Sequence, residues 1–206
     1  MTPPLHAPDT PPALVLGSTS RYRRELLERL RLPFTTASPE VDETPAPGEA
    51  PAALALRLAR AKAEAVAAAH PGAVVIGADQ VADLDGEPIG KPGSHENAVA
   101  QLRRMRGRQV VFQTAVAVVR ADAGVRLAEL APVVVRFRAL DDAEIERYLR
   151  LEQPYDCAGS AKSELLGIAL LDAIESDDPT ALVGLPLIRV ARMLRAAGLD
   201  PVRHAR

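Results

Sequence analysis

The stretch Ala13-Leu14-Val15-Leu16-Gly17-Ser18-Thr19-Ser20-Arg21-Tyr22-Arg23-Arg24 decides the fold. Its short apolar run, 13–17, is typical of a buried strand. The serine and threonine residues that follow offer N-caps to a helix expected from about residue 21 to residue 31, which Pro33 ends. A strand that leads through small residues into a helix opens an α/β pattern, so we predict an α/β fold from residue 13 onward.

The rest of the chain continues this pattern. The Ala-rich stretch 51–69 repeats apolar residues at the helical period, and Asp85-Gly86 is a hairpin signal. We expect further helices at 94–105, 141–150 and from beyond Pro186 to Gly198, and strands at 34–37, 73–78, 81–84, 87–89, 110–120 and 126–137. Because parallel-type strands and antiparallel hairpin strands are mixed, we predict a mixed twisted sheet flanked by helices.

Composition narrows the class of protein. The chain has 206 residues, of which 48% are apolar and 25% charged, as in ordinary globular proteins. Five prolines within residues 1–12 predict a mobile tail, and residues 13–206 are expected to form a single domain. The net charge of −2 argues against a general affinity for nucleic acid or acidic membrane surfaces. It leaves room for a local basic site that binds a small anion.

Cys157 is the single cysteine, so no disulfide can form within the chain and a reducing compartment is expected. The sequence has no apolar run of about 18 residues, the length that a membrane-spanning helix requires. Its first residues have neither the basic nor the apolar region of a secretory signal. We therefore expect a cytoplasmic protein with no membrane partner. The sequence leaves the oligomeric state open, a homodimer included.

Three arginines, Arg21, Arg23 and Arg24, fall in the first turn of the first predicted helix. Positive side chains oppose the helix dipole at that position. They are explained if an anion binds at the helix N-terminus, because arginine forks pair with phosphate oxygens. The alternative is a solvated basic helix face with no ligand.

Three further residues are candidates for chemistry. Asp79 lies at the end of a predicted buried strand, where α/β sheets place ligands, and its carboxylate could bind a divalent cation, activate a water or merely turn the chain. Lys62 lies at the edge of the apolar stripe of its helix, where a lysine usually extends to solvent. Gly90-Lys91-Pro92 is no Walker A loop, because its spacing fails, but Lys91 could still face a phosphate.

The polar segment 155–164 contains Cys157, but no histidine stands at a spacing typical of a nucleophile and its base. A buried thiol without a catalytic role is the favoured interpretation. The four histidines form no zinc pattern. The remaining candidates are cationic side chains that could bind phosphates and carboxylates that could bind a hard metal ion. This set fits hydrolysis of a phosphoanhydride by metal-activated water.

An ordered set of motifs resembles the Maf family of nucleotide pyrophosphatases. The stretch 14–27 matches the family's opening motif. Further matches follow in order over nearly all of 13–201: Val41-Asp42-Glu43-Thr44, Leu58-Ala59-Arg60-Ala61-Lys62-Ala63, Val75-Ile76-Gly77-Ala78-Asp79-Gln80, Leu84-Asp85-Gly86-Glu87, Gly90-Lys91-Pro92 and Leu182-Val183-Gly184-Leu185-Pro186-Leu187. Gly77-Ala78-Asp79-Gln80 and the segment 156–164 resemble the YceF-like branch, whose members are described as 7-methyl-GTP pyrophosphatases.

The resemblance implies an elongated, two-lobed Maf/ITPase-like fold with a deep central cleft. It also implies a nucleotide as the small-molecule partner, a divalent cation (Mg²⁺ or Mn²⁺) as cofactor, and hydrolysis of 7-methyl-GTP to 7-methyl-GMP and diphosphate. Asp79 matches the family's proton acceptor, while Tyr22, Gln80 and Glu164 fall on its specificity positions. We expect the metal to be held by Glu43 and Asp79, and the triphosphate by Ser18, Arg23, Arg24, Lys62 and Lys91.

The residue types at the specificity positions suit a methylated guanine. Its ring carries a positive charge, so Tyr22 could stack on it through a cation–π contact. Glu164 could accept hydrogen bonds from the Watson–Crick edge, and its carboxylate would be left unpaired by uracil or thymine. Arg21 and Leu165 depart from the usual Pro and Gly. The alternatives are therefore a pyrophosphatase for dTTP, UTP or another modified nucleotide, and a nucleotide-binding regulator of cell division with little turnover.

Overall fold

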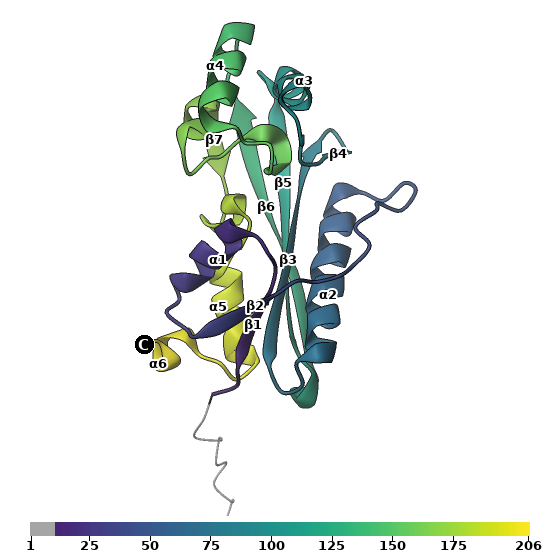
Figure 1. Ribbon diagram of the computed structural model, residues 1–206, viewed down its shortest axis with the longest axis vertical. Helices are drawn as coiled ribbons and strands as arrows, with labels where there is room; N and C mark the ends of the chain where they lie inside the picture. The colour runs from purple at the N-terminus through teal and green to yellow at the C-terminus, as the bar shows by residue number, and fades with distance from the viewer. Residues whose placement is uncertain (1–10) are drawn as a thin grey trace, which may run out of the picture.

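A seven-stranded mixed sheet runs through the molecule (Figure 1). This computed structural model describes residues 11–206. The strand order is β2-β1-β3-β5-β6-β7, and β4 pairs with β3. The parallel strands are β1 (Leu14–Gly17), β2 (Phe34–Ala37) and β3 (Val74–Leu84); antiparallel to their neighbours are β4 (Glu87–Ile89), β5 (Gln109–Arg120), β6 (Val125–Phe137) and β7 (Leu171–Glu175). The predicted mixed sheet flanked by helices is confirmed.

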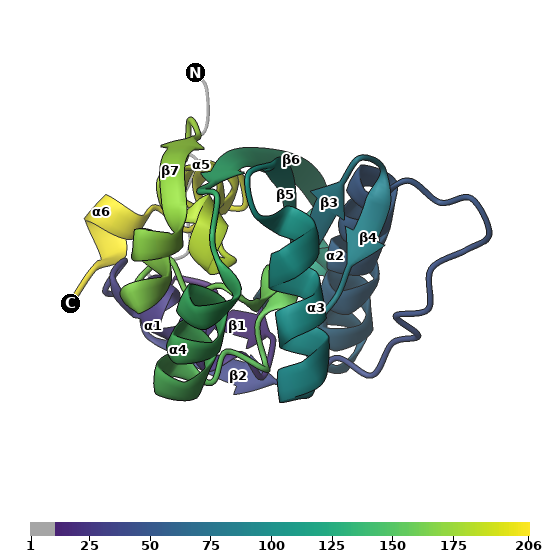
Figure 2. The same cartoon turned by 90° about the horizontal axis from the view of Figure 1, so that it is seen from above.

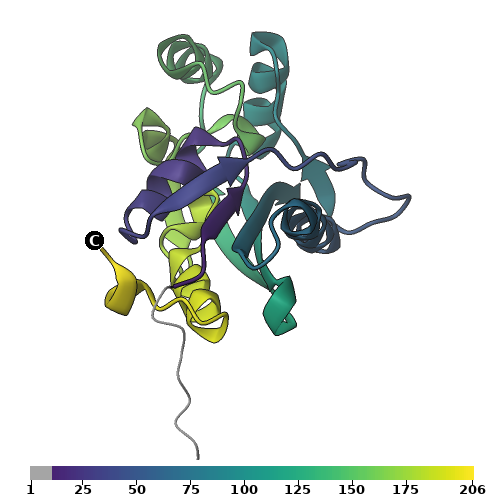
Figure 3. The same ribbon diagram turned by 60° about the horizontal axis from the view of Figure 1, so that its bottom comes forward.

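The side chains of β1 alternate between two buried faces of the sheet. Leu14 and Leu16 pack in the cluster formed with α1 (Arg21–Glu28) and α5 (Leu187–Ala196). Val15 packs on the opposite face, against α2 (Pro51–Ala69). Figure 3 shows α1 and α5 on one side of the sheet and α2 on the other. Burial on both faces explains why this strand is a continuous apolar run in the sequence.

The long strands β3, β5 and β6 carry the sheet from one lobe of the molecule to the other (Figure 1). In the lobe seen end-on in Figure 2, α3 (His95–Met105) and α4 (Asp142–Glu152) lie side by side and pack on an apolar cluster of their own. Ser94 caps α3, as the sequence predicts, and Asp141 forms a capping box with Glu144 on α4. The elongated, two-lobed fold is thereby confirmed.

Three elements differ from the sequence prediction. We expected separate strands at 73–78 and 81–84, but β3 is continuous, because its pairing with β5 runs unbroken from Val75 to Asp83. The helix α1 ends at Glu28 instead of residue 31, since Arg31 has a left-handed backbone with φ of 54°. Pro201 starts a short helix, α6 (Pro201–His204), because proline suits the first helical position and Asp200 caps it.

The strand β7 and four short 3-10 helices were not predicted. β7 lies at the edge of the sheet, and its two acidic residues, Asp172 and Glu175, weaken its strand signal in the sequence. The 3-10 helices are η1 (Ala121–Ala123), η2 (Ala158–Ser160), η3 (Leu166–Leu170) and η4 (Ala181–Val183). Such single turns have no periodicity that a sequence pattern could reveal.

Two expectations concern the outline of the chain. Most of the predicted proline-rich tail, residues 1–10, lies outside the described residues, and the single domain at 13–206 stays a prediction. None of the helices within 11–206 combines the length and the apolar character that crossing a membrane requires.

Candidate active site

A cavity of about 740 Å³ lies where β1 ends. β1 pairs with β3 only as far as Gly17 and Gly77, whereas β3 continues. Neighbouring residues of a strand face opposite sides of the sheet, so Asp79 turns toward α2 and Gln80 toward Thr114 on β5. The cavity reaches both side chains because no strand of the described chain covers this edge of β3 before β4. Ligands of α/β sheets typically bind at such carboxyl ends.

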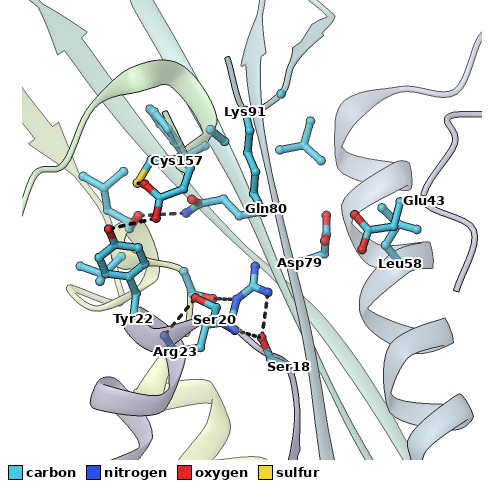
Figure 4. Close-up of a pocket in the computed structure, with 18 of the residues that line it drawn as sticks. Ser18, Ser20, Tyr22, Arg23, Glu43, Leu58, Asp79, Gln80, Lys91 and Cys157 are labelled. Carbon is cyan, nitrogen blue, oxygen red and sulfur yellow. Dashed lines mark hydrogen bonds between the residues drawn. The ribbon is translucent and has the colours of Figure 1, made fainter. Parts of the chain in front are cut away.

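Figure 4 shows Asp79 and Glu43 on one side of the cavity, and a single lysine contacts both carboxylates. The Lys62 Nζ lies 2.7 Å from Oδ1 of Asp79 and 2.7 Å from Oε1 of Glu43. The side chains of Lys62 and Asp79 are 7% and 10% exposed, while that of Glu43 is 60% exposed. The ammonium has three N–H donors, so one is left for a ligand. This group can bind an anion beside a carboxylate that accepts a proton.

The close approach of α2 to β3 sets the distance between Lys62 and Asp79. A Cβ atom added at Gly77 would lie 2.4 Å from both the Ala59 carbonyl oxygen and the Ala63 backbone nitrogen. Only glycine leaves room for the helix at this distance. Its role is therefore to bring the Lys62 side chain within hydrogen-bond reach of the strand.

The first turn of α1 delivers Arg23 to the cavity. The Ser20 side chain caps the helix by accepting from the Arg23 backbone N–H. The Arg23 Nε donates to the Gly184 carbonyl at 2.9 Å, and Nη1 donates to Ser18 Oγ at 3.5 Å. Burial lowers the pKa of Arg23, and the nearby Asp79 and Glu43 carboxylates oppose this shift. The guanidinium is thus fixed in place with further donors free for an anion.

The opposite side of the cavity is built around Tyr22 (Figure 4). Its hydroxyl donates to Asp156 Oδ2 at 3.4 Å and accepts from Arg21 Nη2 at 2.7 Å. The Arg21 guanidinium carbon also lies 4.7 Å from the Tyr22 ring centroid. Lys162 Nζ is 3.8 Å from Asp156 Oδ1. This side therefore offers an aromatic ring beside a carboxylate, which suits a flat and positively charged group.

Comparison with known proteins adds to this geometry. A family described as Maf-like protein matches residues 13–197, which include every segment that lines the cavity. The chain belongs to the Maf family. The fold and the family resemblance expected from the motifs are both confirmed.

Relatives within this family are similar over almost their whole length. A protein of a Polaromonas species, named 7-methyl-GTP pyrophosphatase, is 70% identical over 90% of this chain and 85% of its own length. Proteins of Albidiferax ferrireducens and Bordetella pertussis carry the same name and are each 66% identical. The first covers 90% of this chain and 94% of its own length, the second 95% and 97%.

The Maf fold brings all but one of the expected site residues to the cavity. The exception is Arg24, whose exposed side chain pairs with Glu28 at 3.1 Å along the outer surface of α1. Successive helical residues are turned by about 100°, and this turn places Arg24 beside Glu28, on a face of α1 that does not line the cavity. Lining the cavity are Ser18, Tyr22, Arg23, Glu43, Lys62, Asp79, Gln80, Lys91 and Glu164.

The donor set suits a divalent cation that is bound together with a nucleotide. Within residues 11–206, no group of three or more His, Cys, Asp or Glu side chains could hold a metal by itself. Glu43 and Asp79 nevertheless lie near each other at the cavity, since both contact Lys62 Nζ. Mg²⁺ is commonly held by one or two carboxylates together with waters and substrate phosphates. These two side chains fit that pattern.

Two residues of the 155–164 segment join the site without having been assigned a role from the sequence. Partial burial opposes ionisation of Asp156, but the Cys157 thiol and the Lys162 ammonium outweigh it and lower the pKa of that carboxyl. Burial, with the Asp156 charge, raises the pKa of Cys157 to about 11. Cys157 is half-buried at the cavity instead of fully buried as expected, and its raised pKa makes the thiol a poor nucleophile. In the sequence, the only feature that could have pointed to Asp156 as a site residue is its position next to Cys157 in a polar segment.

Proposed function

We propose that this chain is a nucleoside triphosphate pyrophosphatase that hydrolyses 7-methyl-GTP to 7-methyl-GMP and diphosphate. The observation that carries the proposal is the division of the cavity into two sides. Cations and a carboxylate gather at Lys62 and Asp79, whereas Tyr22 and Asp156 offer a ring and a negative charge at the other side. The names of the relatives, which are 66–70% identical in the three compared, support the same substrate.

The triphosphate is held by groups from three parts of the chain. Arg23 and Ser18 contribute from the strand–helix junction, Lys62 from α2 and Lys91 from the segment after β4. Arginine binds phosphate oxygens as a fork and lysine binds them as a point charge. Gathering these charges in one cavity attracts a polyanion despite the net charge of −2.

Asp79 acts as the base in the hydrolytic step. Lys62 engages its Oδ1, and no hydrogen bond within the described chain engages Oδ2, which is left to accept a proton from water. The water oxygen bonds to the α-phosphorus, the bond from that phosphorus to the α–β bridging oxygen breaks, and diphosphate leaves. Glu43 and Asp79 would hold a divalent cation, whose chemistry is to neutralise charge on the phosphates.

The base binds at the other side of the cavity. The Tyr22 ring offers a face to the methylated guanine, and Asp156 places a negative charge next to that ring. Glu164 lines the cavity and offers a carboxylate to the N–H donors of the Watson–Crick edge. We propose the cytoplasm as the compartment, which the single cysteine, Cys157, supports.

A substrate panel tests the proposed function. The protein is incubated with 7-methyl-GTP, GTP, UTP or dTTP and either Mg²⁺ or Mn²⁺, and released diphosphate and orthophosphate are measured separately. We expect diphosphate, with 7-methyl-GTP giving the highest kcat/KM. A preference for UTP or dTTP would overturn the substrate. Nucleotide binding without release of diphosphate would indicate a regulator with little turnover instead of an enzyme.

A further inference from the structure

The side-chain amide of Gln80 is held by three acceptors behind the cavity wall. Its Nε2 donates to Thr114 Oγ1 at 2.8 Å, and it lies 3.1 Å and 3.0 Å from the carbonyl oxygens of Ala181 and Leu182. Thr114 faces Gln80 directly across the β3–β5 pair and is completely buried. The Thr114 hydroxyl itself donates to the Ala181 carbonyl at 3.0 Å.

These contacts fix which end of the amide faces the cavity. Backbone carbonyls accept hydrogen bonds and cannot donate them. The single hydroxyl proton of Thr114 is used on Ala181, so its oxygen is left to accept from Gln80. All three partners therefore require the amide nitrogen, and a flipped amide would place its oxygen against three acceptors. The Gln80 carbonyl oxygen must point the other way.

The position of that oxygen matters for substrate recognition. Gln80 lines the cavity, and its side chain extends toward the side where Tyr22 and Cys157 lie (Figure 4). No donor among the described residues bonds to Oε1, and Oε1 is not among the fully enclosed unpaired atoms. The Gln80 Oε1 atom is thus a hydrogen-bond acceptor that faces the cavity in a fixed direction. Fixing a polar group in advance lowers the cost of binding its partner.

We propose that Thr114 is a positioning residue for substrate specificity, which holds the Gln80 carbonyl toward a hydrogen-bond donor of the nucleobase. The proposal rests on the proposed function and names the chemistry that Gln80 supplies to it. Guanine and its 7-methyl derivative present N–H donors at adjacent positions of the Watson–Crick edge. Thr114 does not itself line the cavity, and Gln80 is the cavity-lining side chain that its buried hydroxyl contacts.

Replacement of the hydroxyl by a methyl group tests this role. Thr114→Val keeps the shape of the side chain and its place in the strand, but it removes one of the three acceptors and so weakens the hold on the amide. We expect KM for 7-methyl-GTP to rise roughly three- to tenfold, the change that one lost neutral hydrogen bond produces. Thr114→Ser, which keeps the hydroxyl, should restore the wild-type KM. If the valine variant fails to fold, Thr114→Cys takes its place, because a thiol is a weak acceptor.

A competitive inhibitor that lacks a nucleobase distinguishes a loss of nucleobase recognition from a general structural defect. Inorganic tripolyphosphate binds only the phosphate side, so its inhibition constant should be unchanged in Thr114→Val. A parallel rise in KM and in this inhibition constant would indicate a merely structural role and overturn the proposal, as would an unchanged KM. In a Gln80→Met background, Thr114→Val should add less than twofold to KM, since the group that it positions is gone.

The same experiments distinguish this inference from the proposed function. If the wild-type protein releases no diphosphate from 7-methyl-GTP, the proposed function fails and the inference fails with it. If the wild-type protein is active and an additive Thr114→Val effect persists in the Gln80→Met background, only the inference fails. An active wild-type protein, a serine rescue and a Thr114→Val effect that disappears in the Gln80→Met background together support both.

Discussion

The Nζ atom of Lys62 lies 2.7 Å from Oδ1 of Asp79, across the tight contact between α2 and β3. Both side chains are about nine-tenths buried, so neither charge is well solvated once its partner is removed. Glu43 reaches the same ammonium from the exposed segment before α2. The pair therefore links the stability of the fold to the groups that we assign to phosphate binding and proton transfer.

Removing the ammonium should destabilise the protein. We expect Lys62→Met to lower the free energy of unfolding by about 3–5 kcal/mol, because Asp79 is then a buried charge without its partner. Adding Asp79→Asn removes that charge, so the double variant should be more stable than the sum of the single effects predicts. Chemical denaturation measures all three. Lys91→Met is the control, since Lys91 is exposed and should change stability by less than about 0.5 kcal/mol. Strict additivity would contradict the coupling.

Asp79→Asn should abolish most of the activity without abolishing nucleotide binding. An amide cannot accept the water proton, so kcat for diphosphate release should fall about 10²- to 10⁴-fold. The dissociation constant of the nucleotide, measured by calorimetry, should stay within a few fold. Asp85→Asn is the matched control, because Asp85 is an exposed hairpin residue with φ of 54°, which asparagine tolerates. Residual turnover above one tenth of wild type would rule out Asp79 as the base.

The sequence predicts the first half of the fold better than the edges of the sheet. Residues 13–24 predict β1, its cap and α1, because burial on both faces of a strand leaves a continuous apolar run. The division of β3 was wrong because Asp79 and Gln80 look like the end of a strand, although backbone pairing with β5 carries them on. Local polarity cannot reveal a hydrogen-bonding partner that is more than thirty residues away.

The candidate site shows the same division. The motifs predicted Lys62 and Asp79 as site residues. The distance between them depends on Gly77, and only the structure shows how closely α2 packs on β3 at that glycine. Arg24 was expected beside Arg23 and lies outside the cavity, because sequence spacing does not tell which helix face meets the ligand. Thr114 gave no signal, since one threonine in a Val-rich strand looks like an ordinary core residue.

Glu164→Gln should lower selectivity for guanine-type bases. A carboxylate can accept from two adjacent N–H donors, whereas an amide offers one oxygen and turns a donor toward the base. We expect the ratio of kcat/KM for 7-methyl-GTP over UTP to fall at least about tenfold, because a hydrogen bond to a charged group contributes about 1.5–3 kcal/mol. Glu25→Gln serves as the control, because Glu25 is exposed on α1 and does not line the cavity. An unchanged ratio would defeat the assignment of Glu164.

The Cys157 thiol should be slow to alkylate at neutral pH. Burial raises its pKa from 9.0 to about 11, so the reactive thiolate form is about a hundredfold scarcer than in an unfolded chain. Iodoacetamide labelling, followed by mass spectrometry, should accelerate about tenfold per unit between pH 8 and pH 10. The same chain in urea provides the reference rate. Labelling of the folded protein at that reference rate at pH 8 would show that the thiol is not shielded.

Gly77→Ala should impair both stability and catalysis through one displacement. The added Cβ would meet backbone atoms of Ala59 and Ala63 at 2.4 Å, and backbone cannot move aside as a flexible side chain can. The helix α2 must shift outward, which we expect to cost about 1–3 kcal/mol of unfolding free energy. The shift also carries Lys62 away from Asp79. The kcat for diphosphate release should therefore fall even under conditions where the variant is fully folded. Gly90→Ala is the matched control, since Gly90 lines the same cavity but an added Cβ meets nothing within 4 Å there. A destabilised Gly77→Ala variant with unchanged kcat would mean that the close packing supports the fold alone, and that the Lys62–Asp79 distance does not control the reaction.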